Sequence, residues 1–342
     1  MKNPQKNENS QEIPQKKIKK EIKTIAVLCS GGDAPAMNSA IRAVVRSAIG
    51  LGLKIYGVKR GYSGLLMGDI HLLDASSVGN ILQRGGTILQ TSRCEDFLKE
   101  ETRKEAANIL KRKGIDGLIV IGGNGSLKGA MKFQQEHNIP LIGIPGSIDN
   151  DIHGTDYSIG FDTAVQTAVE AVDKIRDTAS SHERNFIVEV MGRKSEAIAF
   201  HVGVCTGAEN IIFPSRKINY KEIYQDIQRG MERGKNSSLI IVAEGDKPGL
   251  SYQVQKKLKE LYSVEAHVCI LGHIQRGGRP TANDRFMASQ MGILAVEAIK
   301  RNDGPAIIVH KKGVTKAMSF EDCFNHTRPE IPSMEIIKTL SI

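Results

Sequence analysis

The residues best suited to chemistry are two aspartates, Asp149 and Asp151, which lie two positions apart in the segment 145–151 after an apolar run. Carboxylates placed in this way can divide their work. One can take a proton from a hydroxyl group as a general base, while the other holds a hydrated Mg²⁺ beside a phosphate. The alternative is an Asp- and Asn-rich turn that caps a helix expected from Gly160.

Two glycine-rich loops, residues 30–38 and 122–126, each follow a β-rich run and open a helical segment. Glycine lets the backbone come close to a ligand, and the amino terminus of a helix presents free N–H groups to an anion. Each loop could instead be a tight turn, with Asp33 or Ser126 as a helix cap. Neither standard nucleotide-binding motif is present. Residues 230–235 have the wrong spacing for a Walker A motif, and no G-x-G-x-x-G motif follows a strand. Bound phosphate would therefore need another architecture.

Separate basic residues follow two later runs. Arg193 ends one, and His273 and Arg276 lie in the glycine-containing segment that ends another. The planar guanidinium group of arginine suits phosphate oxygens. Arg93, in a loop after a short apolar run, could equally be a solvated surface residue. Five Gly- or Asp-rich loops thus fall where strands are expected to end. A phosphoryl-transfer site needs these parts: a cradle for the donor, Mg²⁺, cations over the moving group and a base on the acceptor.

The elements that must position these loops alternate along the chain. Strands are expected over residues 24–29, 54–58, 117–122 and 140–145, and near 186–190, 239–243, 266–271 and 305–309. Helices are expected over residues 37–50, 100–113 and 126–137, and near 76–83, 160–182, 195–204, 220–234, 251–263 and 280–301. This alternation predicts α/β architecture with two doubly wound, Rossmann-like parallel-sheet domains. Ligands bind such sheets at the carboxyl ends of the strands, so the active site is expected in the cleft between the domains.

Length and composition restrict the class of protein. The chain has 342 residues, 40% of them hydrophobic and 25% charged, which predicts about two folded domains without a membrane span. Five scattered cysteines and an amino terminus without an apolar segment predict neither disulfides nor secretion, and therefore a cytoplasmic location.

The net charge is unevenly placed. It is +9, of which residues 1–23, with seven Lys and three Glu, contribute +4 and the remaining residues +5. We expect this polar leader to be disordered. No basic stripe is interleaved with aromatics, which argues against nucleic acid and favours small polyanions as partners.

Six segments together identify a family. SGGDAPAMN, GGNGS, PGSIDND, GTDYSIGFDTA, VEVMGR and LGHIQRGG occur in the order and spacing of ATP-dependent 6-phosphofructokinases of the short bacterial type, which the chain resembles over about residues 24–325. The resemblance implies transfer of the γ-phosphate of ATP to the C1 hydroxyl of fructose 6-phosphate, with ADP as product and Mg²⁺ required. It also implies an allosteric, cytoplasmic, glycolytic homotetramer. The larger, ATP-binding domain would comprise residues 24–160 and 275–325. The smaller domain, for fructose 6-phosphate, would comprise residues 161–274 and 326–342.

The resemblance also implies roles for individual residues. The catalytic group would be the base Asp149 with Ser147, Arg193 and the Gly31 N–H. The ATP site would be Gly31, Arg93, Cys94, Gly122, Gly123, Asn124, Gly125 and Ser126. The sugar-phosphate site would be Ser147, Ile148, Asp149, Met191, Gly192, Arg193, Glu244, His273, Ile274, Gln275 and Arg276, with Arg184 and His267 from a neighbouring subunit. Asp151 and Asn124 would face the metal, and Arg42, Arg46, Arg176, Glu209, Arg233 and Lys235 an effector.

Departures from the family pattern leave alternatives. Asn124 stands where the family has Asp, His267 where it has a second cross-subunit Arg, and Asp69 where an effector-site Arg is expected. A catalytically impaired regulatory or sugar-phosphate-binding subunit is therefore one alternative. Another is a lipid or NAD kinase, which shares the glycine cradle but not the other segments. A third is the pyrophosphate-dependent enzyme, whose members usually carry Asp at the position of Gly125 and Lys at that of Gly146. Glycine at both positions favours ATP.

Overall fold

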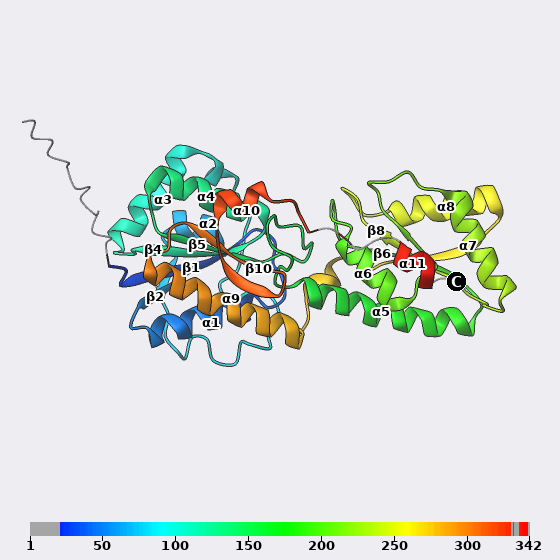
Figure 1. The fold of residues 1–342 in the computed structure, drawn as a ribbon, viewed down its shortest axis with the longest axis horizontal. Coiled ribbons are helices and arrows are strands. Elements are labelled where there is room, and N and C mark those ends of the chain that lie inside the picture. Colours follow the sequence, from blue (N-terminus) through cyan, green and yellow to red (C-terminus); the bar gives the residue numbers. More distant parts are fainter. Residues whose placement is uncertain (1–20, 330, 332–334, 341–342) are drawn as a thin grey trace, which may run out of the picture.

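Two sheets built mainly from parallel strands form the protein, which we describe from a computed structural model covering residues 21–329, 331 and 335–340. Figure 1 shows two α/β bodies side by side, one around each sheet. The larger sheet contains β1 (Thr24–Ser30), β2 (Lys54–Val58), β3 (Ile70–Leu72), β4 (Gly117–Gly122), β5 (Leu141–Pro145), β10 (Ala306–Lys311) and β11 (Val314–Ser319). The smaller contains β6 (Asn185–Val190), β7 (Asn210–Ile212), β8 (Leu239–Ala243) and β9 (Ala266–Ile270).

The helices cover both faces of each sheet. They are α1 (Met37–Gly50), α2 (Gly61–Leu66), α3 (Glu100–Arg112), α4 (Asn124–His137), α5 (Phe161–Ser181), α6 (Ala197–Thr206), α7 (Tyr220–Glu232), α8 (Leu250–Tyr262), α9 (Ala282–Arg301), α10 (Phe320–Asn325) and α11 (Glu335–Leu340). Two short 3₁₀ turns, η1 (Glu95–Leu98) and η2 (Gly272–Arg276), complete the set. In Figure 1, α1 and α9 lie below the larger sheet, and α3, α4 and α10 lie above it.

The order of strands in the larger sheet is β11-β10-β5-β4-β1-β2-β3. Its central strands are parallel and almost wholly apolar, as strands buried on both faces must be. In β1, Ile25 and Val27 face the core under α1 and α9, while Ala26 and Leu28 face the core under α2, α3 and α4. The chain leaves β1 toward β2 on one side and returns as β4 on the other. The order of strands therefore reverses beside β1, which is where doubly wound sheets bind ligands.

The smaller sheet has the order β7-β8-β6-β9, and its pairs are all parallel. Helices α5 and α6 cover one face, and α7 and α8 cover the other. The expected doubly wound arrangement is thus present in both bodies. Two antiparallel pairs, β2 with β3 and β10 with β11, occupy the edges of the larger sheet and make it mixed rather than wholly parallel.

One expected element is wrong. Residues 76–83 form turns and irregular backbone rather than a helix, and Val78 and Ile81 are buried in the main core from this irregular segment. The short strands β3, β7 and β11 were not expected. Strands β3 and β7 are only three residues long, which gives little periodic signal, and β11 is an edge strand with no buried residue.

The larger sheet lies within residues 24–160 and 275–325, the smaller within residues 161–274, and α11 packs against α6 of the smaller body. Most of the expected leader, residues 1–20, lies outside the described residues. The ordered body begins before Thr24, because Ile22 is buried and the backbone N–H groups of Lys23 and Thr24 donate to the Asp116 carboxylate. In the described part of the chain, no helix combines the length and apolarity needed to cross a membrane.

Candidate active site

A cleft of about 420 Å³ lies at the carboxyl ends of β1, β4 and β5. Parallel pairing sets Ser30 opposite Gly122, and Gly122 opposite Pro145, so the three following loops start at one level. The residues that line the cleft come mainly from these loops, from residues 93–98 and from segments that follow strands of the smaller sheet. They are Ser30, Gly31, Gly32, Asp33, Tyr62, Arg93, Cys94, Glu95, Phe97, Leu98, Gly123, Asn124, Gly125, Ser126, Gly129, Gly146, Ser147, Asp149, Asp151, Arg193 and Arg276. Both aspartates, both glycine loops and three of the expected arginines therefore meet in one place.

Asp149 is the most perturbed carboxyl group of the cleft. Burial, and then the charge of Asp151, raise its pKa from 3.8 to about 6, against the lowering effect of Arg276 and Arg193. The Asp149 N–H donates to the Ser147 hydroxyl at 3.2 Å, which fixes the turn between these two residues. A carboxyl group with a pKa near neutrality is suited to accept a proton at physiological pH.

The loop that carries Asp149 is folded by its neighbour Asn150, which the sequence did not single out. Asn150 is buried with φ of +46°, in the left-handed region that Asn tolerates better than most residues. Its Oδ1 accepts the Ser158 N–H at 2.8 Å, its Nδ2 donates to the Asp156 carbonyl at 3.1 Å, and the Ser158 hydroxyl donates to the Ser147 carbonyl at 2.7 Å. Placed between two aspartates, Asn150 turns inward so that both carboxylates line the cleft.

The amino terminus of α4 forms a second wall. Gly123 is its N-cap and supplies no side-chain cap, so the first turn presents its N–H groups beside the cleft-lining residues Asn124, Gly125 and Ser126. A Cβ at Gly122 would lie 2.5 Å from the Ser30 carbonyl oxygen, which explains the glycine, because β1 and β4 approach closely there. An uncapped helix amino terminus in a cleft favours an anion such as phosphate.

Two arginines reach the cleft from outside the larger sheet. Arg193 follows β6 of the smaller body and has φ of +49°. Arg276, at the end of η2, donates through Nη1 to the Asp33 carbonyl at 3.0 Å and packs against Gly32, where a Cβ would lie 3.0 Å from the same Nη1. The cleft therefore receives positive charge from two residues that follow strands of the smaller sheet, and Arg276 lies directly against the first glycine loop.

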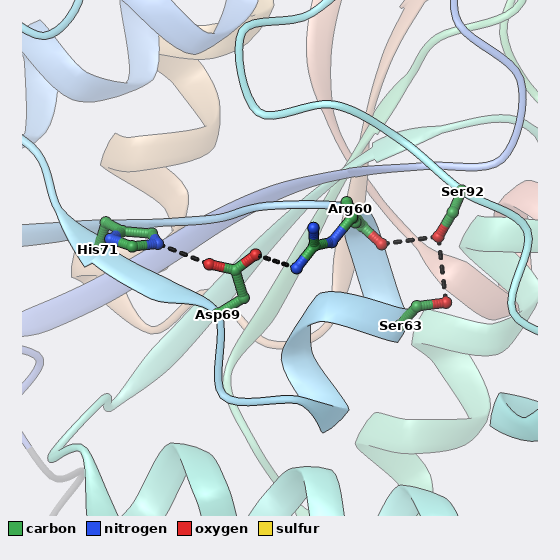
Figure 2. A network of polar contacts seen from close by, with 5 residues as sticks. All are labelled: Arg60, Ser63, Asp69, His71 and Ser92. Carbon is green, nitrogen blue, oxygen red and sulfur yellow. Dashed lines mark hydrogen bonds and ion pairs between the residues drawn. The ribbon is translucent and has the colours of Figure 1, made fainter.

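The segment carrying Arg93 and Cys94 is anchored by a polar network, shown in Figure 2. The Ser92 hydroxyl donates to the Arg60 carbonyl at 2.8 Å and lies 3.1 Å from the Ser63 hydroxyl. The Arg60 guanidinium bonds to Asp69 at 2.6 Å, and His71 bonds to the same carboxylate. Asp69, which stands where an arginine was expected, therefore pairs locally with Arg60, the residue whose carbonyl holds Ser92.

Gly31 differs from its expected role in this arrangement. Its N–H donates to the Ser92 carbonyl at 3.2 Å, and its carbonyl accepts the Thr91 hydroxyl at 2.9 Å. The N–H expected to assist the moving phosphoryl group is thus already bonded to the Arg93 segment. What Gly31 does provide is space, because its φ is +91° and a Cβ there would lie 3.0 Å from the Ser126 hydroxyl.

The cleft contains oxygen atoms suited to a divalent metal ion. Asn124 donates through Nδ2 to the Asp151 carbonyl at 3.0 Å, which leaves its buried Oδ1 without a hydrogen-bond partner. The Asp151 carboxylate lines the same cleft. No group of three or more His, Cys, Asp or Glu side chains that could hold a metal occurs in the described ranges. This donor set fits Mg²⁺, which usually takes one or two protein oxygens and completes its shell with water and substrate phosphates.

Other expected residues surround the cleft without lining it. Glu244 is buried at the end of β8, where burial and Glu189 raise its pKa while Arg193, Arg276 and His273 lower it. Gln275 is fully buried and accepts the Met191 N–H at 2.8 Å, so it orients the turn before Arg193. Gly122 and Ile148 are buried behind the loops, Gly192 lies in the turn after β6, and Ile274 is 56% exposed and projects outward.

Arg184 and His267 are not brought to this cleft. They lie at the amino ends of β6 and β9, whereas Met191 and Glu244 follow the carboxyl ends of β6 and β8. A strand rises about 3.3 Å per residue, so roughly 20 Å separates the two edges of the sheet.

The expected effector residues form two separate groups. Arg42 and Arg46 lie on α1 of the larger body. On the smaller body, the Lys235 ammonium group pairs with Glu209 at 2.9 Å, and Arg176 donates to the carbonyls of Thr206 and Gly207. Arg233 ends α7, close in sequence to Lys235.

The aromatic end of the cleft was missed by the sequence analysis. The rings of Tyr62 and Phe97 stack with centroids 3.8 Å apart and 10° between their planes, and both residues line the cleft. The Tyr62 hydroxyl donates to the Ser126 carbonyl at 2.8 Å, which ties the stack to α4. Neither residue lies in a recognisable motif, so only the fold relates them to the glycine loop.

Comparisons with known proteins agree on one family. The phosphofructokinase family model matches residues 24–299. An ATP-dependent 6-phosphofructokinase 1 of Thermus thermophilus is 52% identical over 278 residues, covering 81% of this chain and 86% of that one. An ATP-dependent 6-phosphofructokinase of Clostridium acetobutylicum is 49% identical over 319 residues, covering 92% and 99%.

Solved structures give the same fold. A phosphofructokinase of Saccharomyces cerevisiae superimposes with a TM-score of 0.81 at 36% identity, covering 93% of this chain and 46% of that longer one. A pyrophosphate-dependent phosphofructokinase of Nitrosospira multiformis has a TM-score of 0.82 at 19% identity, covering 93% and 91%, which is evidence for the fold alone.

The raised pKa of Asp149 predicts that the ionised side chain lowers the free energy of unfolding at neutral pH. Its pKa of about 6 in the folded protein exceeds the ordinary value of 3.8, so the folded protein holds the proton more tightly than the unfolded chain. The stability that this proton contributes is fully present below about pH 4 and is lost as the pH rises through 6. Two pKa units correspond to about 3 kcal/mol.

Asp149→Asn should therefore be more stable than the wild type by up to about 3 kcal/mol at pH 8, with the difference disappearing near pH 4. Urea unfolding at pH 4, 6 and 8 measures this difference. A gain that stays the same at all three pH values would contradict the assignment.

Proposed function

We infer, because this chain belongs to the phosphofructokinase family, that it phosphorylates the C1 hydroxyl of fructose 6-phosphate with ATP. It is an ATP-dependent kinase of glycolysis, and its products are fructose 1,6-bisphosphate and ADP. The observation that carries this function at the level of the site is Asp149, a buried carboxyl group with a pKa of about 6, in the same cleft as the uncapped amino terminus of α4. The nucleotide would bind the larger body and the sugar phosphate the smaller one, in the cytoplasm.

Asp149 would act as the general base. Its carboxylate accepts the proton of the C1 hydroxyl as the oxygen attacks the γ-phosphorus, and the bond from that phosphorus to the β–γ bridging oxygen breaks. Ser147 and Asn150 hold the loop that presents the carboxylate. Asp151 contributes by its charge, which helps to keep the pKa of Asp149 above its usual range.

Negative charge on the moving phosphoryl group would be balanced from two sides. Arg193 lies on one side, with Arg276 held toward the cleft by the Asp33 carbonyl. The first-turn N–H groups of α4 lie on the other and cradle the donor phosphates. Arg93 lines the cleft on the segment held by Ser92 and adds a further positive charge. The Tyr62–Phe97 stack would bound the nucleoside end.

Mg²⁺ would be held by Asp151 and by the free Oδ1 of Asn124, directly or through its water molecules. When bound, the ion would neutralise charge on the β- and γ-phosphates. Asn124 is neutral where the family pattern has a carboxylate, so this chain would hold the ion less tightly.

The sugar phosphate would lie against Glu244, His273 and Arg276. Arg184 and His267, at the far edge of the smaller sheet, would serve the cleft of another copy, which requires an oligomer, and we propose a tetramer. The two effector groups, on α1 and around Glu209, would likewise meet across an interface and form an allosteric site.

Donor choice follows from Gly125. A Cβ at this position would meet nothing within 4 Å, so the cleft is open there and a side chain would project into it. An aspartate would repel the phosphates of a bound nucleotide, whereas glycine leaves room for them. ATP is therefore the donor and pyrophosphate is not.

Acidification should switch the enzyme off. Because Asp149 must be ionised to accept the proton, kcat/KM should fall about tenfold per pH unit below pH 6. Rates measured with a coupled assay between pH 5 and 8.5, at saturating ATP and Mg²⁺, test this expectation, and a rate that stays flat from pH 7 down to pH 5 would contradict it.

Asp149→Ser should reduce turnover by about 10²–10⁴-fold or more, since general acid–base catalysis contributes a factor of this size. Binding of ATP, followed by calorimetry, should change little. Turnover that survives the substitution would exclude Asp149 as the base.

Asn124→Asp should lower the Mg²⁺ concentration needed for half-maximal rate, because a carboxylate replaces an amide oxygen beside the ion. Titration of the rate with Mg²⁺ at saturating ATP measures this. The same titration on Asn124→Ala, which loses the oxygen, should shift the other way. An unaltered requirement in both variants would place the ion elsewhere.

Gly125→Asp should raise the KM for ATP at least tenfold, while Gly125→Ala, which adds the same Cβ without charge, should leave it within about threefold. Parallel donor assays with ATP and pyrophosphate decide the point. Equal effects of the two substitutions would show that the repulsion is steric rather than electrostatic.

A further inference from the structure

Asp284 is a fully buried carboxylate that the phosphoryl-transfer chemistry does not use. It lies in the first turn of α9, and no cation of the described chain pairs with it. Its oxygens instead accept hydrogen bonds from segments more than 100 positions earlier in the chain. Oδ1 accepts the Tyr157 hydroxyl at 2.6 Å and the Gly160 N–H at 2.7 Å, while Oδ2 accepts the Thr163 N–H at 2.8 Å and the Thr163 hydroxyl.

The sequence around Asp284 has the spacing of a helix capping box. Thr281 is the N-cap of α9, and its hydroxyl oxygen accepts the Asp284 N–H at 3.2 Å. In an ordinary capping box, an acidic side chain three residues after the cap returns to the N–H of the cap residue. Here the Asp284 carboxylate turns away and caps a different helix, α5, whose own N-cap Gly160 provides no side chain for the purpose.

The exchange is reciprocal. Thr163 of α5 accepts the Thr281 N–H on its hydroxyl oxygen at 3.1 Å, the bond that Asp284 would otherwise provide. The Thr281 hydroxyl donates to Asp162 at 2.5 Å. Each helix therefore satisfies the first N–H groups of the other, and neither terminus is capped by its own segment alone.

The two helices belong to different bodies. Helix α5 packs against α6 and β6 of the smaller body, and α9 packs against α1 and β5 of the larger one. Each begins where the chain passes between the bodies, after residue 160 and after η2. The residues that must face one another during phosphoryl transfer are divided in the same way: Asp149 precedes α5 on the larger body, and Arg193 and Glu244 lie on the smaller.

The same carboxylate also reaches the catalytic loop. The Tyr157 hydroxyl and the Gly160 N–H lie at the end of the segment that starts with Ser147 and Asp149. Ser158, between them, holds Asn150 and the Ser147 carbonyl. A displacement of α5 at Asp284 would therefore be transmitted to the loop through Ser158 and Asn150.

We propose that Asp284 is a positioning residue, which exchanges helix caps between α5 and α9 and so sets the orientation of the sugar-phosphate body relative to Asp149. This role rests on the proposed function, since it concerns how fructose 6-phosphate is held against the base. The ATP cradle is built on the larger body and does not depend on that orientation. Loss of the exchanged cap should therefore affect the two substrates unequally.

Asp284→Asn tests the proposal with an almost isosteric side chain. One carboxylate oxygen becomes an NH₂ group that faces one N–H and one hydroxyl group, so at least the bond from that N–H is lost. We expect the KM for fructose 6-phosphate to rise at least fivefold and kcat to fall about tenfold, with the dissociation constant for ATP within twofold of the wild type. Proportional changes for both substrates, or wild-type constants in a folded variant, would overturn the proposal.

A second pair of variants keeps the proposal testable if Asp284→Asn does not fold. Thr163→Val removes the hydroxyl that both donates to Asp284 and accepts from Thr281, at nearly constant volume, while Thr163→Ser keeps it. Thr163→Val should show the same unequal effect and Thr163→Ser should not. Equal kinetics for the Val and Ser variants would contradict the proposed exchange.

The control for general loss of a cap is Asn219→Ala. Asn219 caps α7 within the smaller body by accepting the Glu222 N–H at 3.3 Å. This variant should lose thermal stability but keep both substrate constants, and a change like that of Asp284→Asn would show that any lost cap has this effect. If the wild-type chain does not phosphorylate fructose 6-phosphate, the proposed function is wrong. If the wild type is active and the substitutions at Asp284 and Thr163 act equally on both substrates, only the proposal for Asp284 is wrong.

Discussion

The parallel register of β1, β4 and β5 is the constraint on which the rest of the site depends. Because Ser30, Gly122 and Pro145 lie opposite one another, three loops distant in sequence leave the sheet at one level. Two of them bring helix amino termini to that edge, and the third brings a pair of carboxylates. A slip of one residue in any of these strands would invert its buried face and move its loop out of the cleft.

Buried carboxylates in this protein differ in whether backbone N–H and hydroxyl groups donate hydrogen bonds to them. This difference distinguishes the structural carboxylates from the one expected to act in catalysis. Glu189 accepts the N–H groups of Gly249 and Ser251 and the Ser251 hydroxyl, so its charge is met by donors at the start of α8. Asp284 accepts donors at the start of α5 in the same manner, and these hydrogen bonds lower its pKa against the raising effect of burial. Asp149 is buried beside another acid, no donor among the described residues bonds to its carboxylate oxygens, and its pKa rises to about 6. The acid left least solvated by the protein is the one that can exchange a proton with a substrate.

Much of this was predictable from local sequence. The loops around Gly31, Asn124 and Asp149 follow apolar runs long enough to be strands, and the helices between them have clear periodicity, so the architecture and the core of the cleft were expected correctly. The predictions were wrong or incomplete where an element depends on contacts with residues distant in sequence. A helix was expected near residues 76–83, where the chain forms turns instead, and the strands β3, β7 and β11 exist because a neighbouring strand pairs with them.

Single side chains were harder to predict than elements. Tyr62 and Phe97 reach the cleft only through the packing of α2 and η1. The spacing of Thr281 and Asp284 indicates a self-capped helix, and no local pattern shows that the carboxylate serves another helix. The Gly31 N–H was expected to be available, but the Ser92 carbonyl takes it. Arg184 and His267, which were expected to serve a neighbouring subunit, lie at the amino edge of their sheet, away from this chain's own cleft.

The connectivity of the larger sheet has a consequence for biosynthesis. Strands β10 and β11 and helix α9 come from residues 282–319, after all four strands of the smaller sheet have been made, yet β10 pairs with β5 and α9 covers α1. While the ribosome is still translating residues 161–274, the amino-terminal half has β5 as an open edge and an uncovered apolar face on α1. Such surfaces are prone to association with other chains. The sheet of the smaller body, whose strands all lie within residues 185–270, can form at once, so a sheet encoded second is completed first and only α11 is added to that body later.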